Sequence, residues 1–407
     1  MYCPRILEKK VLHYSKYFPV LWVTGQRQTG KTAMLRELSA GSHNYANLDD
    51  PKVFDLAFSD PALFMQDYPP PVIIGEIQYA PHLLRHIKFA ADSLRKPGLF
   101  WLTGSQQYHL MKNIPESLAG RAGILTLMGL SRREMESQGL DQQPFLPDPK
   151  ILRSGNPPVP HLAAAGIFQI IWRGSLPFLV QNKNFSPAAY YSAYCRTYIE
   201  RDVRDLSQVG DLSAFRHFMI ACAARTGQLL NMADLARDAE ISQATCKKWL
   251  SILEAGGLIY LLEPYFPNIT KRLVKAPKLY FLDTGLAAWL IGWSSAEVLK
   301  NGIMAGAFFE TWVIGELLKS WLHNGQDPPF FYYRDRDQRE IDLLIYQDDT
   351  LYPLEIKMTA SPKISHVRHF QVLEKLKKPI GPGGLICLTD RSLPLTEKIR
   401  TVPVNYI

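Results

Sequence analysis

An eight-residue stretch near the N-terminus combines two glycines, a lysine and a hydroxyl at a spacing suited to binding phosphate. It reads GQRQTGKT over residues 25–32 and fits G-x-x-x-x-G-K-[ST] at every fixed position. Gly25 and Gly30 let the backbone curl, so that N–H groups point at phosphate oxygens. Lys31 can reach the β- and γ-phosphates of a nucleotide, and the Thr32 hydroxyl can bind Mg²⁺. The stretch therefore predicts a site for ATP and Mg²⁺, made by Gly25, Gln28, Thr29, Gly30, Lys31 and Thr32.

The surroundings of this stretch support the same interpretation. An apolar run, VLWVT, precedes it and a helical pattern, AMLREL, follows it, which predicts a strand, a loop and a helix. The N-terminus of such a helix adds partial positive charge beside a bound phosphate. A glycine-containing turn that matches by chance is the alternative, and the combination of strand, loop and helix disfavours it.

A second stretch, VIIGEIQ, has the form of a buried strand that ends in an acidic residue. P-loop ATPases end one central strand with an Asp for Mg²⁺ and a Glu for the attacking water. Here Glu76 is present, but Gly75 offers no carboxylate. We therefore expect ATP binding through the P-loop, weaker retention of Mg²⁺ and slow turnover. Asp49 or Asp50 could replace the missing ligand, although a place on the turn before the next proline is the simpler expectation.

A third set of residues combines carboxylates with a lysine. Glu310 lies in a helical pattern, Asp342 in the run REIDLLIY, and Glu355 and Lys357 in YPLEIK. Side chains two apart on a strand share one face, so Glu355 and Lys357 point the same way. Asp342 and Glu355 can hold a Mg²⁺ ion, and the lysine can position or activate water. An inert binding or assembly module is the alternative function. Two further carboxylates are near alternatives for the acidic roles: Glu316 and Glu340.

The pattern of apolar runs places these residues on a chain of several domains. Residues 1–138 alternate short apolar runs with helical patterns, which predicts an α/β domain with a mostly parallel sheet and helices on both faces. Residues 139–180 include a proline-rich segment and predict a linker, or surface loop, and a connecting helix. Residues 181–300 are mainly helical. Residues 301–407 predict a C-terminal α/β domain, with a long helix over 305–322, three strands, a second helix and a final strand.

Within the helical region, residues 231–265 predict a winged helix. Ser242 is a candidate N-cap for the second helix, QATCKKWLSILEAGG, which ends at two glycines. This layout matches a helix-turn-helix, so Lys247 and Lys248 could face a DNA groove. A winged helix that serves only as a packing module is the alternative. The basic run KRLVKAPK follows and could contact DNA phosphates through Lys271, Arg272, Lys275 and Lys278.

Five short motifs occur in order across residues 25–121, namely GQRQTGKT, NLDDP, GEIQ, LTGS and ESLAGR. Together they resemble a family of prokaryotic AAA-type ATPases. The later segments RTGQLLN, KLYFLDTGL and LEIK resemble the helical and C-terminal region of unassigned function that follows the ATPase in that family. The chain departs from the family at Gly75, where the usual motif is D-E-I-Q. The order of helix Glu, strand Asp and E-x-K further resembles the PD-(D/E)xK nuclease fold.

The resemblance implies catalytic roles for further residues. Glu76 is similar to the base that orients water, and Thr103 or Ser105 is similar to the polar sensor that touches water or the γ-phosphate. Arg121, in ESLAGR, is similar to an arginine finger or sensor arginine, which neutralises charge on the transferred phosphoryl group. A salt-bridged surface arginine is the alternative. An arginine that acts in trans would require a homo-oligomer.

Composition sets the remaining limits. A chain of 407 residues suggests two or three domains, and 47% hydrophobic residues are enough for several cores. The net charge of +8 favours polyanionic partners such as DNA. The five scattered cysteines indicate neither a zinc site nor a disulfide framework. No apolar run approaches the ~20 residues needed to span a bilayer, and the charged N-terminal segment argues against a secretory signal. We therefore expect a cytoplasmic protein without membrane contact.

The residues support two functional hypotheses. The first is an ATP-binding AAA-type protein with slow or impaired ATP hydrolysis, whose nucleotide state is coupled to a DNA-binding or nuclease-like C-terminal region. The alternative is a nucleotide-held switch or interaction protein without ATP hydrolysis or nuclease activity. Gly75 favours the alternative, whereas Glu76, Arg121 and the C-terminal carboxylates favour the first hypothesis.

Overall fold

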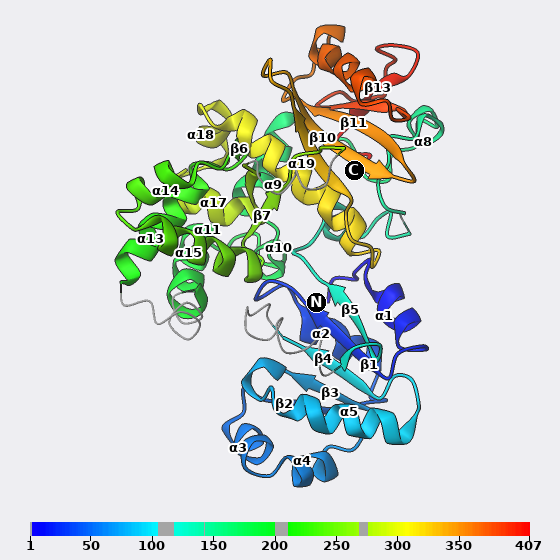
Figure 1. The fold of residues 1–407 in the computed structure, drawn as a ribbon, viewed down its shortest axis with the longest axis vertical. Coiled ribbons are helices and arrows are strands. Elements are labelled where there is room, and N and C mark those ends of the chain that lie inside the picture. The colour runs from blue at the N-terminus through cyan, green and yellow to red at the C-terminus, as the bar shows by residue number, and fades with distance from the viewer. Residues whose placement is uncertain (1, 105–117, 142, 200–210, 268–275) are drawn as a thin grey trace.

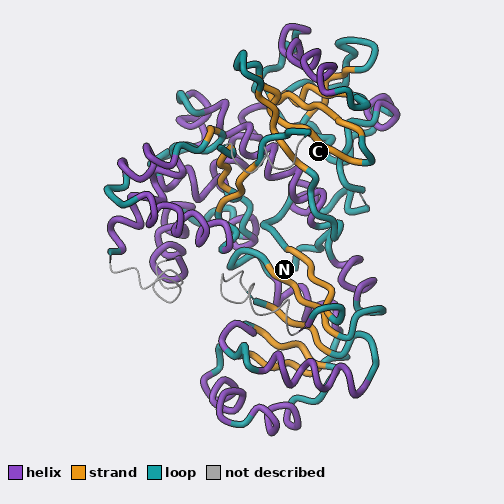
Figure 2. The backbone as a smooth tube through the Cα atoms, viewed as in Figure 1, coloured by secondary structure: helices purple, strands orange, loops and turns teal. Residues whose placement is uncertain are grey.

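The chain forms three parts that meet around one long helix, α19 (Ala305–Leu322), in the computed structural model (Figure 1). An N-terminal sheet with its helices lies at one end, a helical part lies beside α19, and a second large sheet lies at the other end. Figure 2 shows the same division, with strands concentrated in the two end parts. The structure describes residues 2–104, 118–141, 143–199, 211–267 and 276–407.

The N-terminal part is an α/β domain with a five-stranded parallel sheet in the order β2-β3-β4-β1-β5. Along β1, Val20 and Trp22 enter one hydrophobic core, and Leu21 and Val23 enter another. Both faces of the sheet are therefore covered, which explains why the inner strands β1, β3 and β4 read as continuous apolar runs. The predicted fold class is confirmed. The strands are β1 (Val20–Thr24), β2 (Asn44–Asn47), β3 (Val72–Gly75), β4 (Phe100–Thr103) and β5 (Ala122–Thr126).

Helices cover the two faces of this sheet. α1 and α2 contribute Val11, Met34 and Leu35 to one core, and α5 contributes Leu84 and Ile87 to the other. Because parallel strands end at the same edge, the C-terminal ends of β1, β3 and β4 lie together there. The helices are α1 (Glu8–Tyr14), α2 (Lys31–Ser39), α3 (Pro51–Ser59), α4 (Pro61–Asp67) and α5 (Leu83–Leu94).

The predicted linker is not a free surface loop throughout. After α7 (Arg132–Glu136), it contains the short helix α8 (Pro149–Arg153), and Phe145 and Leu152 are buried in the large core that also holds α19. The backbone N–H of Phe145 donates to Ser320 Oγ, and its carbonyl accepts from the indole N–H of Trp321. Apolar side chains between the prolines thus anchor this segment to a helix far away in sequence.

In the helical part, residues 231–265 contain the two expected helices and one strand, and this strand pairs with a strand that lies beyond residue 265. Ser242 caps α15 by accepting a hydrogen bond from the N–H of Thr245 at 3.1 Å, as the sequence predicts. α15 ends before two glycines, and three short antiparallel strands, in the order β6-β8-β7, complete this unit. Its main elements are α9 (Ala164–Arg173), α10 (Pro177–Gln181), α11 (Pro187–Tyr194), α13 (Leu212–Ala223), β6 (Gln228–Leu229), α14 (Met232–Asp238), α15 (Gln243–Ala255), β7 (Ile259–Leu262), β8 (Lys278–Phe281), α17 (Thr284–Leu290) and α18 (Ala296–Asn301).

The C-terminal part is a mixed sheet in the order β13-β12-β11-β10-β9. β9, β10 and β11 pair antiparallel, whereas β11, β12 and β13 pair parallel. The long helix and four of these strands agree with the sequence prediction, whereas β13 was not predicted and the second helix is 3₁₀-helical. The elements are β9 (Phe330–Arg334), β10 (Glu340–Gln347), β11 (Thr350–Ile356), the 3₁₀ segment η3 (Ile364–Leu376), β12 (Gly383–Cys387) and β13 (Ile399–Pro403).

Candidate functional site

The P-loop lies between β1 and α2, at the edge where the parallel strands end. Gly25 has φ 137°, and a Cβ there would collide with the carbonyl oxygen of Leu127. Gly30 has φ 90° and directly precedes α2, so the backbone requires both glycines. Lys31 Nζ donates to the carbonyls of Gly25 at 2.9 Å and of Gln26 at 2.8 Å. The ammonium group is therefore held against the loop, at the N-terminus of α2.

Three predicted site residues meet at the end of β4. Thr32 Oγ1 lies 3.3 Å from Thr103 Oγ1, and the Thr103 hydroxyl accepts from the N–H of Glu76 at 3.4 Å. The hydroxyl predicted to bind Mg²⁺ thus lies next to the predicted sensor and base. The loop and these side chains fit a nucleotide with Mg²⁺, and their individual roles stay predictions. The other candidate sensor, Ser105, lies outside the described residues.

Glu76 has a backbone conformation that is unusual for its residue type. Its φ of 55° lies in the left-handed region, which non-glycine residues adopt rarely. Its carboxylate accepts a hydrogen bond from Gln78 Nε2, two residues later. Strain of this kind is often found where a side chain must be aimed at a functional site. Gln78 therefore orients the carboxylate that we predict to be the catalytic base.

Gly75 lies next to two neutral polar groups. It pairs in register with Asn47 of β2, and a Cβ at Gly75 would lie 3.3 Å from Asn47 Oδ1 and 3.4 Å from the Tyr45 hydroxyl. Asp50 is the N-cap of α3, where its carboxylate accepts from the N–H of Lys52 at 2.9 Å, so it lies on the expected turn. The space that an Asp side chain would enter is thus bordered by an amide and a phenol.

Arg121 lies at the sheet edge opposite the P-loop. It directly precedes β5, whose first residue pairs with Val20, the first residue of β1. Its guanidinium forms a double hydrogen bond with Asp92 of α5, at 2.5 and 3.1 Å, and this bond holds the pKa of Asp92 below its ordinary value. A sensor role toward the nucleotide of its own chain does not fit this placement. A role as an arginine finger in trans stays a prediction.

A buried group of ionisable residues joins the P-loop to the end of α19. Arg5 donates to the carbonyl of Thr29 in the loop at 2.8 Å, and its Nε lies 3.1 Å from Glu134 Oε1. His323, directly after α19, places Nδ1 3.1 Å from the same oxygen. Its Nε2 accepts from the N–H of Met128 at 3.2 Å, which requires a neutral ring. The side chains of Arg5, Glu134 and His323 thus link the P-loop to the end of α19.

The charges of this group are set by one another. Burial alone would raise the pKa of Glu134, but Arg5 and His323 hold it below its ordinary value. Burial lowers the pKa of His323, in agreement with its neutral ring. Glu316 is also buried, but it pairs with Lys319 at 2.8 Å and accepts from the N–H of Arg132, away from the other C-terminal carboxylates. It is therefore not part of the predicted nuclease-like set.

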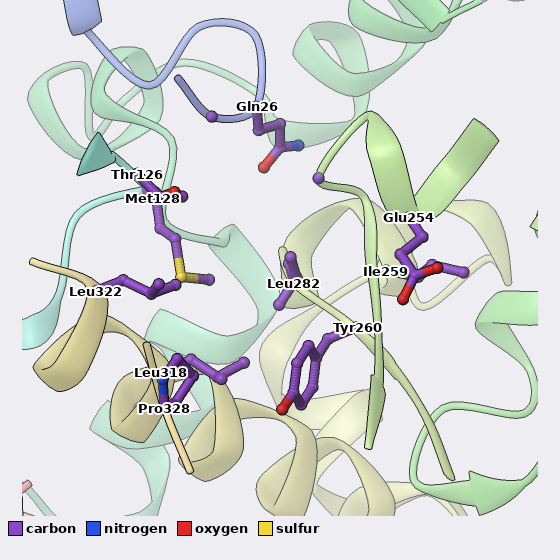
Figure 3. A pocket seen from close by; sticks show the side chains of 13 residues that line it. Gln26, Thr126, Met128, Glu254, Ile259, Tyr260, Leu282, Leu318, Leu322 and Pro328 are labelled. Atoms are coloured by element: carbon purple, nitrogen blue, oxygen red, sulfur yellow. The ribbon is translucent and has the colours of Figure 1, made fainter. Parts of the chain in front are cut away.

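A cavity of about 190 Å³ lies beneath the P-loop, where the three parts of the chain meet (Figure 3). Gln26 borders it from the loop, Tyr260 from β7, and Leu318 and Leu322 from α19. The amide of Gln26 also donates to the hydroxyl of Tyr194, at the end of α11, at 3.2 Å. The P-loop therefore contacts the helical part directly as well as through the buried charges.

The predicted nuclease-like residues lie together in the C-terminal part. Lys357 Nζ lies 3.2 Å from Asp342 Oδ2 and 2.8 Å from Glu355 Oε1. Glu310 joins them through a second lysine, Lys278, whose Nζ lies 3.3 Å from Glu310 Oε1 and 3.8 Å from Asp342 Oδ1. We call Glu310, Glu340, Asp342 and Glu355, with the two lysines, the carboxylate cluster. The spacing of the residues in the sequence thus identified most of its members.

Lys278 is the member whose role sequence analysis predicted wrongly. It was expected to contact DNA phosphates, but its side chain is 3% exposed and its Nζ lies 2.6 Å from Glu340 Oε1. Glu340, a near alternative in the sequence, is therefore a member of the cluster. The position of Lys278 within the apolar run KLYFL is the signal that could have indicated a buried lysine.

The cluster carries more acidic than basic groups, since four carboxylates face two lysines. Burial, with the charge of Asp342 adding to it, raises the pKa of Glu310 to about 7 and that of Glu355 to about 8. Glu355 Oε2 has no hydrogen-bond partner within the described residues. No three His, Cys, Asp or Glu side chains of the described residues are arranged to hold a metal ion. The carboxylates are arranged around lysines instead.

The predicted DNA contacts are only partly covered by the structure. Lys247 and Lys248 are exposed on α15. Their contact with DNA stays a prediction. Lys271, Arg272 and Lys275 lie outside the described residues.

Sequence analysis missed the residues that join the parts. Arg5, Glu134 and His323 are far apart along the chain, and nothing local shows that they meet. The pattern S-x-x-E at Ser131 and Glu134 indicates only the capping box that forms at α7, and not the distant partners of Glu134. Asn47 was overlooked because its place beside Gly75 depends on the register of β2 and β3.

Known families match each part of the chain. Residues 17–136 match a family described as an AAA domain. Residues 165–297 and 305–407 match two families described as domains of unknown function, DUF8612 and DUF4143. Together with the complete P-loop and the parallel sheet, the first of these matches identifies residues 17–136 as an AAA-type, P-loop ATPase-like domain. The predicted resemblance is confirmed, including a C-terminal domain of unassigned function.

Similar proteins are found in bacteria and archaea. The chain is 27% identical over 401 residues to the uncharacterized proteins Mb2031c of Mycobacterium bovis and Rv2008c of Mycobacterium tuberculosis, covering 98% of this chain and 82% of each relative. Similar solved structures include the Walker-type ATPase paby2304 of Pyrococcus abyssi, with 15% identity, a TM-score of 0.43, and coverage of 70% of this chain and 94% of that one. Another is a STAND protein with a tetratricopeptide repeat sensor, PH0952 of Pyrococcus horikoshii, with 9% identity, a TM-score of 0.22, and coverage of 75% and 44%. Among the described residues, no helix has the length and apolar character to cross a membrane.

Proposed function

We propose that the chain is a nucleotide switch that binds ATP with Mg²⁺, hydrolyses it slowly and passes its nucleotide state to the helical and C-terminal parts. One observation carries the proposal. The P-loop is complete, whereas the strand that should supply the Mg²⁺-binding Asp ends at Gly75, beside Asn47 and Tyr45. In the proposed complex, Lys31 and the N-terminus of α2 bind the phosphates, and Thr32 binds the metal.

Slow hydrolysis follows from the charges at this edge. Glu76 remains to orient the attacking water, but Gly75 provides no negative charge to hold the metal. Asn47 offers a neutral amide oxygen 3.3 Å from where a Cβ of residue 75 would lie. A neutral acceptor binds water of a hydrated cation more weakly than a carboxylate does. We therefore expect Mg²⁺ to remain bound mainly through Thr32 and the nucleotide, and the transition state to be poorly stabilised.

The contacts of the loop with other parts support the switch. Tyr194 of the helical part contacts Gln26, and Arg5 contacts Thr29 while it faces Glu134. A change in loop conformation on nucleotide binding must alter these contacts, because the loop, Arg5 and Glu134 are tightly packed. The movement would reach α19 through His323.

The test is ATP affinity and Mg²⁺-dependent turnover of the wild type beside Gly75→Asp. The wild type should bind ATP but turn it over well below ~1 s⁻¹, the low end of ordinary enzyme rates. Gly75→Asp should raise turnover, and Gly75→Asp with Asn47→Ala should raise it further, because the amide that crowds the new side chain is removed. Gly75→Ala is the matched control without a carboxylate. Wild-type turnover of ~1 s⁻¹ or faster would show that another group already holds the metal.

A second candidate function is Mg²⁺-dependent cleavage of nucleic acid. It is favoured by the convergence of Asp342, Glu355 and Lys357. A nicking assay with Lys357→Ala as control tests it, and absence of cleavage at every metal concentration would remove the nuclease role.

Binding of DNA is the related proposal for the helical part. The proposal is supported by this part's order of a helix, a strand, two helices and two strands, which is compatible with a winged helix, and by the exposure of Lys247 and Lys248 on the second helix of the pair. Lys247→Glu with Lys248→Glu should weaken salt-dependent binding of duplex DNA. Unchanged binding of duplex DNA would indicate that α15 serves only to pack against the rest of the chain.

A further inference from the structure

We infer that Lys278 is a tethered cation that neutralises the carboxylate cluster and competes with divalent metal ions for it. Lys278 belongs to β8 of the helical part, whereas the carboxylates belong to α19, β10 and β11. One part of the chain thus supplies the positive charge that the acidic groups of another part require.

The distances show how closely Lys278 is engaged. Its Nζ lies 2.6 Å from Glu340 Oε1, 3.3 Å from Glu310 Oε1 and 3.8 Å from Asp342 Oδ1. The first of these distances is that of a strong, charge-assisted hydrogen bond. Tyr280 lies two residues further along β8, on the same face, and its hydroxyl donates to Glu310 Oε1 at 2.7 Å. The strand therefore contacts the cluster at two successive inward positions.

Lys278 differs from the other lysine of the cluster. Lys357 is 40% exposed at its side chain and directly follows β11, the strand that carries Glu355. Lys278 is 3% exposed and comes from outside the C-terminal part. It is therefore an addition to the nuclease-like set, and it contacts the side of the cluster formed by Glu310 and Glu340.

An ammonium group and a divalent cation bind to the same carboxylate oxygens. A bound Mg²⁺ or Mn²⁺ would need several carboxylate oxygens at roughly 2.0–2.6 Å. The ammonium of Lys278 already lies among three of those carboxylates and would repel the ion. Glu355 Oε2, which is buried and has no partner within the described residues, is a further oxygen available to a metal. Withdrawal of Lys278 would remove the competing charge.

The inference is tested by Mn²⁺ binding without nucleotide, measured by calorimetry and by the electron paramagnetic resonance signal of free Mn²⁺. Lys278→Met removes the charge and keeps most of the side-chain volume. It should bind Mn²⁺ at least about tenfold more tightly than the wild type, because a unit charge within ~4 Å of the ion is lost. Lys278→Arg keeps the charge and should bind like the wild type. Lys278→Met with Asp342→Asn should lose the gain, which would assign it to the cluster.

A second variant guards against misfolding. If Lys278→Met is unfolded by circular dichroism, Lys278→Met with Glu340→Gln removes one charge of each sign and leaves Glu310, Asp342 and Glu355. It should fold and show the same gain. Equal Mn²⁺ affinity in the wild type and the folded variants would overturn the inference. Because no nucleotide is present, this outcome is independent of whether ATP is hydrolysed.

Discussion

Two buried lysines mark the two candidate sites, and their partners differ. Lys31 donates to two backbone carbonyls of its own loop, whereas Lys278 is surrounded by three carboxylates from another part of the chain. A phosphate is a stronger partner for an ammonium group than a neutral carbonyl, so Lys31 gains when it transfers to a nucleotide. Lys278 already has anionic partners. A buried lysine can thus be ready for a ligand or take the place of one.

The two sites also differ in their acidic groups, which are reduced at the nucleotide site and in excess in the carboxylate cluster. The nucleotide site has lost a carboxylate at Gly75 and is bordered by Asn47 and Tyr45. The cluster has more carboxylates than lysines, and the pKa of Glu310 is raised to about 7 by burial and by Asp342. The first site should therefore respond most to added negative charge, and the second to removed positive charge.

The largest effect is expected at the P-loop. Lys31→Ala should weaken ATP binding by about 100-fold or more, because the charged donor to the phosphates is lost. Titration with a fluorescent ATP analogue measures the affinity. The control is Lys16→Ala, which removes an exposed lysine just after α1 and should change nothing. Wild-type ATP affinity in Lys31→Ala would show that Lys31 does not bind the phosphates.

The next effect concerns the stability of the cluster. Lys278→Met should lower the free energy of unfolding by about 3–5 kcal/mol, because it removes the cation paired with the largely buried Glu310 and the closest cation of Glu340. Urea unfolding followed by circular dichroism measures it. Lys357→Met should cost less, since its side chain is 40% exposed to solvent. A similar loss in both variants would mean that the two lysines are equivalent.

A smaller effect should appear as a dependence of stability on pH. The pKa of Glu355 is raised from 4.5 to about 8, mainly by burial. Between these values the folded state binds more protons than the unfolded state, so stability should fall as the pH rises toward 8. The expected change is on the order of 1 kcal/mol or more. Urea unfolding at several pH values between about 6.5 and 8 measures it, and comparison with a control variant removes the contribution of His323, which titrates in the unfolded state near pH 6.5.

Glu355→Gln is the control for this dependence. It cannot titrate, so its stability should vary less over the same pH range. An equal slope in the wild type and in Glu355→Gln would assign the dependence to other groups.

The smallest effect is expected at Arg121. Its pair with Asp92 is exposed, so Arg121→Ala should leave stability nearly unchanged. If the arginine acts in trans, the variant should lose the rise of ATP turnover with protein concentration, which light scattering would link to assembly. Turnover per chain that is independent of concentration in the wild type would remove this role.

Local patterns in the sequence predicted the residues of each candidate site better than the contacts between the parts of the chain. The P-loop was fully predicted because its glycines, lysine and threonine act within one turn of backbone. Glu355 and Lys357 were correctly placed on one face because strand parity is local. The role of Lys278 could not be inferred, because β8 meets the cluster only through tertiary packing.

The same limit applies to the joints between the parts. Glu134 accepts from the N–H of Ile6, which is 128 residues away in sequence, and also faces His323. No periodicity or motif near Glu134 indicates either partner. The strand register that brings Asn47 to Gly75 is likewise set by the whole sheet.

The contacts of Glu134 also make the folding of one part of the chain depend on another. Its carboxylate is buried between Arg5, at the start of the chain, and His323, beyond α19. If the AAA domain formed alone, Glu134 would lack one of its partners, and Lys319 could not donate to the carbonyl of Leu130. The isolated domain should therefore be less stable than the same domain in the whole chain. Contacts with the segment that ends α19 complete its native state. The parts should therefore fold and unfold together, and a variant that destabilises one part should destabilise the others.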